Sequence, residues 1–198
     1  LTARAQGTIE GALRRIALSA RLANAALLAP GFPGPVALDG TVTDDGSGYQ
    51  VDLRGAGPGG SSASVTGRMA SDFSSANLGL TGRAETALAN AFIAPRSING
   101  PLSFDLRLNG KPGLPALSGQ VIANGARLVE PTLGLSLEEI AARADISGGR
   151  AQLGINGRLG SGGQISVNGP VTLSAPFATD LRIALDRARL RDPDLYDT

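Results

Sequence analysis

The sequence contains no cysteine, no histidine and no tryptophan, and aromatic residues make up only 4% of it. Without cysteine the chain can form neither a disulfide framework nor a thiolate metal site. Without histidine it lacks the commonest metal ligand and general base, so the usual Ser-His triads are not available. We therefore expect a protein that is not an enzyme, with no catalytic residues, no metal and no cofactor.

Long apolar runs and an excess of one charge are missing as well. No stretch of about 18 apolar residues is present to span a bilayer, and no signal-peptide pattern opens the chain. The net charge of +1 is too balanced to indicate a nucleic-acid partner. The 18 basic residues include one lysine, Lys111. This arginine excess fits either the codon usage of a GC-rich genome or contacts between guanidinium groups and lipid phosphates.

Glycine, in contrast, is abundant at 28 residues, and it separates short runs in which apolar and polar residues alternate. In the clearest run Leu102, Phe104, Leu106 and Leu108 alternate with polar residues, which predicts a half-buried strand. Glycine-bearing turns at short intervals predict about a dozen antiparallel strands. We expect turns at Asp45-Gly46-Ser47-Gly48, Asn109-Gly110, Asn124-Gly125, Ser147-Gly148-Gly149, Asn156-Gly157 and Gly160-Ser161-Gly162-Gly163.

Helix signals are few. Leu88, Ala91 and Phe92 have helical spacing before Pro95, and segment 22–28 has a similar pattern before a proline. Both segments predict short helical turns. In a third candidate, 137–144, the apolar register shifts, which fits a helical turn, a β-bulge or a change of strand.

Two segments recur 66 residues apart. Leu-Ala-Asn-Ala begins at positions 22 and 88, and Gly-Pro followed by alternating residues begins at 34 and 100. A weaker echo begins at Asn168-Gly169-Pro170. Repetition at a fixed period is typical of elongated, stacked architectures. We predict one continuous β segment over 1–198, with internal repeats at 16–82 and 83–150 and a partial third at 151–198.

Two motifs resemble functional sites, but the residues around them do not fit those functions. Gly55, Gly57 and Gly60 have the spacing of a dinucleotide loop, yet a strand-like segment follows in place of a helix, and Pro58 removes a backbone donor. The adjacent carboxylates Asp44 and Asp45 are interpreted as a hairpin turn, because catalysis needs two carboxyl groups that converge across a cleft.

The main candidate site is therefore a surface, namely the apolar face that the alternating runs share. A second sheet or closure into a barrel would cover such a face. Alternatively, an open sheet would shelter acyl chains along it. The candidate lining residues are Val36, Leu38, Val51, Leu53, Leu78, Leu80, Leu102, Phe104, Leu106, Leu108, Leu133, Leu135, Leu153, Ile155, Ile165, Val167, Leu181, Ile183 and Leu185.

An ordered series of strand-and-turn patterns carries a resemblance to a known family. The series includes Leu117-Ser118-Gly119-Gln120-Val121, Gly125-Ala126-Arg127-Leu128-Val129-Glu130-Pro131, Leu133-Gly134-Leu135-Ser136-Leu137-Glu138-Glu139-Ile140 and Ile165-Ser166-Val167-Asn168-Gly169. It resembles the C-terminal periplasmic β region of the TamB family, the translocation and assembly module within the AsmA-like superfamily. The resemblance covers nearly the whole chain, most clearly from about Leu78 onward.

The resemblance implies a taco-shaped β trough in the Gram-negative envelope. It implies the periplasmic region of an inner-membrane-anchored protein, whose anchor lies outside this chain. It also implies work in outer-membrane biogenesis: lipid transport, assistance to protein assembly and secretion, and partnership with the outer-membrane barrel TamA. The chain opens within a pattern and stops soon after a strand-like run, so we interpret it as a fragment of a longer protein.

We expect an all-β fold: an elongated, mostly antiparallel sheet curled into an open taco-like trough with an apolar interior and one to three short helical turns. The expected function is a lipid-transfer conduit segment that shields phospholipid acyl chains. Two alternatives stay open. One is a surface that binds unfolded outer-membrane protein clients by β-augmentation, and the other is a structural spacer.

Overall fold

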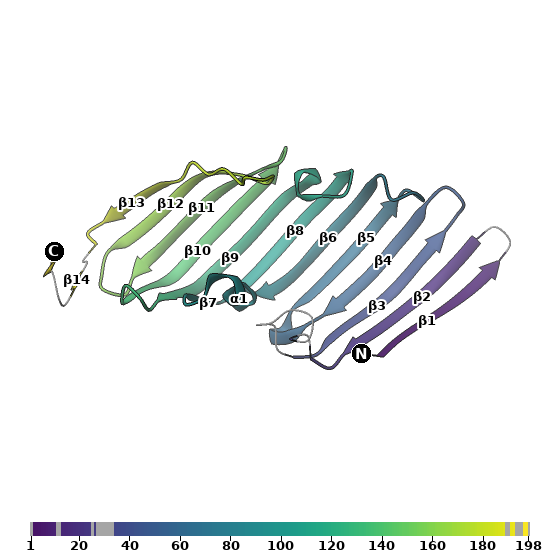
Figure 1. Ribbon diagram of the computed structural model, residues 1–198, viewed down its shortest axis with the longest axis horizontal. Helices are drawn as coiled ribbons and strands as arrows, with labels where there is room; N and C mark the ends of the chain where they lie inside the picture. Colours follow the sequence, from purple (N-terminus) through teal and green to yellow (C-terminus); the bar gives the residue numbers. More distant parts are fainter. Residues whose placement is uncertain are drawn as a thin grey trace.

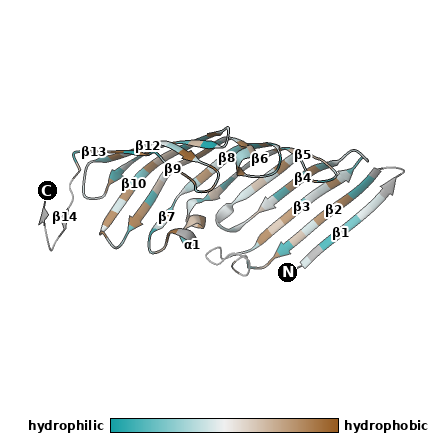
Figure 2. Ribbon diagram, turned by 45° about the horizontal axis from the view of Figure 1, so that its top comes forward, coloured by the Kyte–Doolittle hydropathy of each residue, from teal (hydrophilic) through white to brown (hydrophobic). Residues whose placement is uncertain are grey.

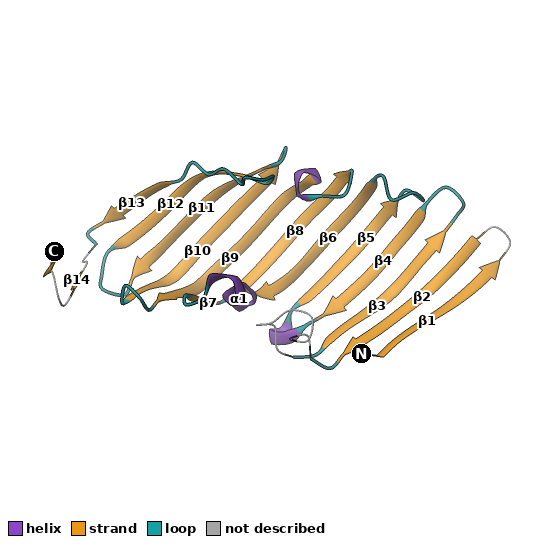
Figure 3. Ribbon diagram, in the orientation of Figure 1, coloured by secondary structure: helices purple, strands orange, loops and turns teal. Residues whose placement is uncertain are grey.

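The computed structural model describes residues 2–10, 13–24, 26, 34–188, 191–192 and 196–197. Strands make up most of this part (Figures 1 and 3). They are β1 (Thr2–Glu10), β2 (Leu13–Leu22), β3 (Val36–Asp44), β4 (Tyr49–Ala56), β5 (Ser62–Met69), β6 (Ala76–Glu85), β7 (Ser97–Asn99), β8 (Pro101–Gly110), β9 (Leu117–Glu130), β10 (Leu135–Ser147), β11 (Arg150–Leu159), β12 (Gln164–Thr172), β13 (Arg182–Asp186), β14 (Arg191–Asp192) and β15 (Tyr196–Asp197).

Thirteen of these strands form one antiparallel sheet, in which neighbours along the chain are neighbours in space. The order is β1-β2-β3-β4-β5-β6-β8-β9-β10-β11-β12-β13, and the short β7 pairs with the extended end of β9. The sheet does not close into a barrel, and β1 and β13 lie at opposite ends of a long, twisted ribbon (Figure 1). The expected all-β, antiparallel, open sheet is thus confirmed.

Short polar turns connect many of the strands. Between β3 and β4, the Asp44 carboxylate accepts a hydrogen bond from Gly46 N at 2.9 Å, and the Asp45 carboxylate accepts one from Ser47 N at 3.0 Å. Because both carboxylates bind backbone amides of the same turn, the interpretation of this pair as a turn is confirmed. The segments 147–149 and 160–163 also connect strands.

Three of the expected glycine turns lie within strands. Asn109-Gly110 forms the end of β8, where both residues pair with β6. Asn124-Gly125 lies within β9, where Gly125 has a φ of 73° and the pairing with β10 is irregular. Asn156-Gly157 lies within β11, because Asn156 is exposed on one face while Gly157 packs beside Ile140 on the other. Asn124-Gly125 therefore forms a β-bulge, and Gly157 allows close packing of a neighbouring side chain, instead of either pair forming a turn.

Helical structure is confined to connections. Around the repeated Leu-Ala-Asn-Ala at position 88, the 3₁₀ helix η3 (Thr86–Ala89) leads into α1 (Asn90–Ile93), as predicted. The other 3₁₀ turns are η2 (Pro58–Gly60) and η4 (Leu114–Ala116). Segment 137–144 belongs to β10, whose irregular pairing near Glu139, with a φ of 51°, is a bulge. The predicted turn at 22–28 lies largely outside the described residues.

The two copies of the repeat use their asparagine in a similar way. The Asn24 side chain accepts hydrogen bonds from Ala26 N at 3.0 Å and Gly34 N at 3.1 Å. The Asn90 side chain accepts one from Ile98 N at 2.7 Å. Each therefore binds a backbone amide shortly before a Gly-Pro-initiated strand, Gly34 before β3 and Ile98 before β8. The third echo differs, because Gly169-Pro170 lies inside β12 instead of before a strand.

The shape leaves an unusually large surface in contact with solvent. The accessible surface is 12563 Å², whereas a compact monomer of this mass exposes about 8,700 Å². No large side chain in the described part is fully buried. One sheet without a second layer accounts for both observations.

Candidate functional site: an uncovered apolar face

Strand β8 shows how the sheet separates two kinds of surface. Leu102, Phe104, Leu106 and Leu108 are half-buried, whereas the residues between them are exposed. Because successive side chains of a strand point to opposite faces, the four apolar residues share one face. Figure 2 shows the resulting pattern, in which hydrophobic and hydrophilic residues alternate along the strands.

The strand register extends this apolar face across the sheet. Residues that pair directly in antiparallel strands point to the same face. Leu106 pairs with Leu80 of β6, which pairs with Val65 of β5, which in turn pairs with Leu53 of β4. Towards the C-terminus, Ile155 of β11 pairs with Val167 of β12, which pairs with Ile183 of β13. One apolar face thus runs through both halves of the ribbon.

Of the predicted lining residues, those in strands lie on this face. Two do not lie in strands. Leu133 occupies the turn between β9 and β10 and is 65% exposed. Leu181 precedes β13, which begins at Arg182 after an irregular connection in which Phe177 N donates to Ser174 O at 2.7 Å.

Sequence reasoning also missed several members of the apolar face. Ile16 and Leu18 of β2 pair with Val42 and Gly40 of β3 and lie on the apolar face. The signal that could have predicted this strand is the alternation of apolar with small or polar residues that begins after Arg15. Ile140, which is 4% exposed, was obscured by the bulge in β10. Val65 was obscured by the small residues that surround it.

Glycines on the apolar face bring neighbouring strands close together. Gly67 of β5 has a φ of 138°, and a Cβ added there would lie 2.1 Å from the carbonyl oxygen of Asn77 in β6. The ring of Phe104 occupies the space above Gly82, so that a Cβ added to Gly82 would lie 2.5 Å from Cζ of Phe104. Glycine in a strand interior permits a local bend of the strand. Larger neighbours then fill the space above it.

Within the described residues, no second sheet or helical layer covers this face. The apolar residues that are buried are few and mostly small, such as Ala76, Ala123 and Ala126. Larger side chains remain in contact with solvent, among them Ile16 at 42% and Ile183 at 66% exposure. The apolar face is therefore an open surface shielded only by contacts among its own side chains.

The opposite face is polar and carries ion pairs. Arg21 contacts Asp39 at 2.8 Å, and Arg143 contacts Asp145 at 2.6 Å. Hydrogen bonds from Arg21 and Ser19 hold the pKa of Asp39 below its usual value, and a hydrogen bond from Arg143 does the same for the pKa of Asp145. These pairs keep the face charged and hydrated, so it differs chemically from the apolar face across the same backbone.

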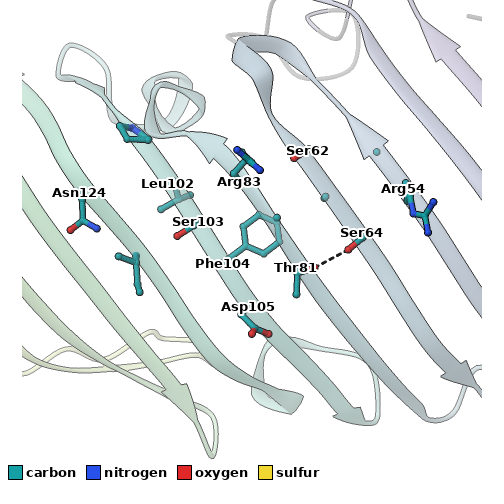
Figure 4. A pocket seen from close by; sticks show the side chains of 15 residues that line it. Arg54, Ser62, Ser64, Thr81, Arg83, Leu102, Ser103, Phe104, Asp105 and Asn124 are labelled. Atoms are coloured by element: carbon teal, nitrogen blue, oxygen red, sulfur yellow. Dashed lines mark hydrogen bonds between the residues drawn. The ribbon is translucent and has the colours of Figure 1, made fainter.

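A wide hollow also lies on the polar face (Figure 4). It has a volume of about 790 Å³ and crosses strands β4 to β9. Its floor includes Ser62, Ser64 and Thr81, and the last two side chains share a hydrogen bond of 2.8 Å. Arg54 and Arg83 lie at its margin. Sequence reasoning missed this hollow, because it forms only where five strands lie side by side.

The described residues contain no cluster of three or more carboxylates that could hold a metal ion. Of the three glycines with dinucleotide-loop spacing, Gly55 lies in β4, while Gly57 and Gly60 lie in the connection to β5, and strand β5 follows it. No helix among the described residues is long and apolar enough to cross a bilayer. Comparisons with protein-family models, curated proteins and solved structures give no match.

Proposed function

We propose that this chain is a segment of a lipid-transfer conduit, in which the apolar face shelters phospholipid acyl chains. The observation that supports the proposal best is that one apolar face continues through the sheet without a covering layer. Exposed aliphatic surface of this extent is unfavourable in water, and acyl chains are an apolar partner that places few demands on side-chain geometry.

The resemblance to the TamB family supplies a setting for this activity. In that setting the segment crosses the periplasm, works in outer-membrane biogenesis and cooperates with the outer-membrane barrel TamA. A passive mechanism suffices: acyl chains move along the apolar face while headgroups remain in water. No chemical step is required, which agrees with a face made of aliphatic side chains.

A charge on the apolar face provides the test. Leu106→Arg places a guanidinium group among aliphatic side chains, and we expect binding of a fluorescent fatty acid to weaken by at least about tenfold. The matched control is Arg107→Ser, one residue away on the exposed face, which is expected to change binding by less than about twofold. Equal binding by both variants and the unmodified chain would contradict the proposal.

The β13 edge supports a second candidate function, the binding of unfolded outer-membrane protein strands. All residues of β13 are exposed, including Leu185 at 51%, and the described part has no strand on its outer side. An unpaired edge offers backbone groups to an incoming strand. A photo-reactive residue at Ile183 is expected to crosslink an unfolded barrel protein diluted from urea if this second function holds, and crosslinks to lipid alone would count against it.

A further inference from the structure

Two phenylalanines lie exposed in turns at the same long edge of the ribbon. Phe73, between β5 and β6, is 58% exposed, and Phe177, between β12 and β13, is 52% exposed. Both turns lie along the upper edge in Figure 1. In each turn the phenylalanine N–H donates to the carbonyl oxygen three residues earlier, Ala70 at 3.0 Å and Ser174 at 2.7 Å. The two aromatic side chains are thus presented by similar turns.

Both phenylalanines also adopt a left-handed backbone conformation. Phe73 has a φ of 59° and Phe177 a φ of 55°. This conformation is unfavourable for a residue with a Cβ, and glycine would adopt it at no steric cost. An exposed ring adds unfavourable contact with water. A left-handed backbone and an exposed ring occur together at two separate turns, which indicates that the exposed rings have a function.

A third apolar side chain lies at the same edge. Leu114, between β8 and β9, is 50% exposed. The adjacent residue Pro115 packs beside Gly149, since a Cβ added to Gly149 would lie 3.7 Å from Cβ of Pro115. The carbonyl oxygen of Gly149 accepts a hydrogen bond from Leu173 N at 2.8 Å. The turn that carries Leu114 and the segment that leads to Phe177 therefore lie against the same β10–β11 turn.

Basic side chains accompany the apolar ones. Lys111, in the connection that carries Leu114, and Arg150, at the start of β11 opposite Thr172, are exposed at this edge, and none of the ion pairs among the described residues includes them. Apolar side chains beside uncompensated basic groups are the combination that favours the surface of an anionic bilayer.

The edge is continuous with the apolar face. The Phe73 ring stacks on Tyr49, with ring centroids 5.5 Å apart. Tyr49 pairs with Met69, which pairs with Ala76, and all three lie on the apolar face. An acyl chain that enters beside Phe73 would therefore meet apolar surface without crossing the polar face.

We propose that the edge defined by Phe73, Leu114 and Phe177 docks onto a phospholipid bilayer. The three apolar side chains insert between the lipids, and Lys111 and Arg150 contact lipid phosphates. The proposal deepens the proposed function and rests on it for the fate of the lipid, since it identifies where lipid meets the apolar face. A bilayer fits better than a protein partner because the contacts are separate apolar tips instead of one continuous patch, with basic residues on the side of Leu114 and Phe177 and Asp72 beside Phe73.

The test uses the whole chain with Phe73→Gly and Phe177→Gly combined. Glycine relieves the left-handed backbone at both positions but removes the stacking of Phe73 on Tyr49, so the two effects oppose each other and thermal stability is expected to change little. Sedimentation with vesicles of phosphatidylethanolamine and phosphatidylglycerol is expected to show binding weakened by at least about tenfold. The matched control is Leu133→Ser, which removes an equally exposed side chain at the opposite edge and is expected to leave vesicle binding unchanged. Vesicles of phosphatidylcholine alone are expected to bind the unmodified chain more weakly.

Vesicle binding unaffected by the two glycines, or no vesicle binding by the unmodified chain, would overturn the proposal in favour of a protein partner. Fatty-acid binding in solution, measured without vesicles, separates this result from the proposed function. The glycine variant is expected to keep that binding. Vesicle docking without fatty-acid binding would overturn the proposed function and leave the docking edge standing.

Discussion

The two faces of the sheet share one backbone and differ at every step along it. On β8, Leu106 contributes to an apolar face that runs through the sheet, whereas the adjacent Arg107 is exposed on a polar face with ion pairs. The apolar face contains close-packed glycines and few charges, and the polar face contains a hollow of about 790 Å³. The comparison teaches that neighbouring substitutions should have very different effects, according to the face on which they lie.

The largest expected effect on stability comes from the glycines. Gly67→Ala would bring a Cβ to 2.1 Å from a carbonyl oxygen at a φ of 138°, so we expect the free energy of unfolding to fall by about 2–4 kcal/mol. Gly79→Ala, on the next strand and the polar face, has ordinary contact distances and should change it by less than about 1 kcal/mol. Urea unfolding of both variants measures the difference. Equal losses would break the distinction between the faces.

A smaller effect is expected at the buried carboxylate Glu130. It is 6% exposed, pairs with Arg96 and accepts a hydrogen bond from Thr132 N at 3.0 Å. Burial opposes its charged form, but the contacts from Thr132 and Arg96 outweigh burial and lower its pKa. Arg96→Ala should therefore lower the thermal midpoint clearly more than Arg127→Ala, whose partner Glu138 is far more exposed. Similar midpoints would show that the Glu130 pair adds nothing beyond a surface ion pair.

The smallest effect concerns pH and Asp45 on the β3–β4 turn. Hydrogen bonds from Ser47 N and Arg68 lower the pKa of Asp45 from 3.8 to about 2. A carboxylate with a depressed folded pKa stabilises the fold above its unfolded pKa, and this contribution is lost as the pH falls from about 4 towards 2. Asp45→Asn should lower the urea midpoint at neutral pH and reduce its decline over that acid range. An unchanged acid profile would contradict the assignment.

The sequence was sufficient to predict the open antiparallel sheet and most of the apolar face, because alternation with a period of two survives wherever one face is apolar. It was insufficient where the backbone is irregular. Asn156-Gly157 has the composition of a turn, yet tertiary packing of Gly157 beside Ile140 keeps it in β11. Phe177 continues an alternating run by spacing, but its left-handed backbone places it in a turn. The polar hollow depends on five strands together, which no local pattern reveals.

Site-specific photo-crosslinking to lipid is the most direct test of the central claim. A photo-reactive residue is placed at Leu106 in one protein and at Arg107 in another, and each is irradiated with phospholipid present. We predict lipid adducts at position 106 and few at position 107. Equal labelling at both positions, or no adduct at position 106, would contradict a lipid-sheltering apolar face.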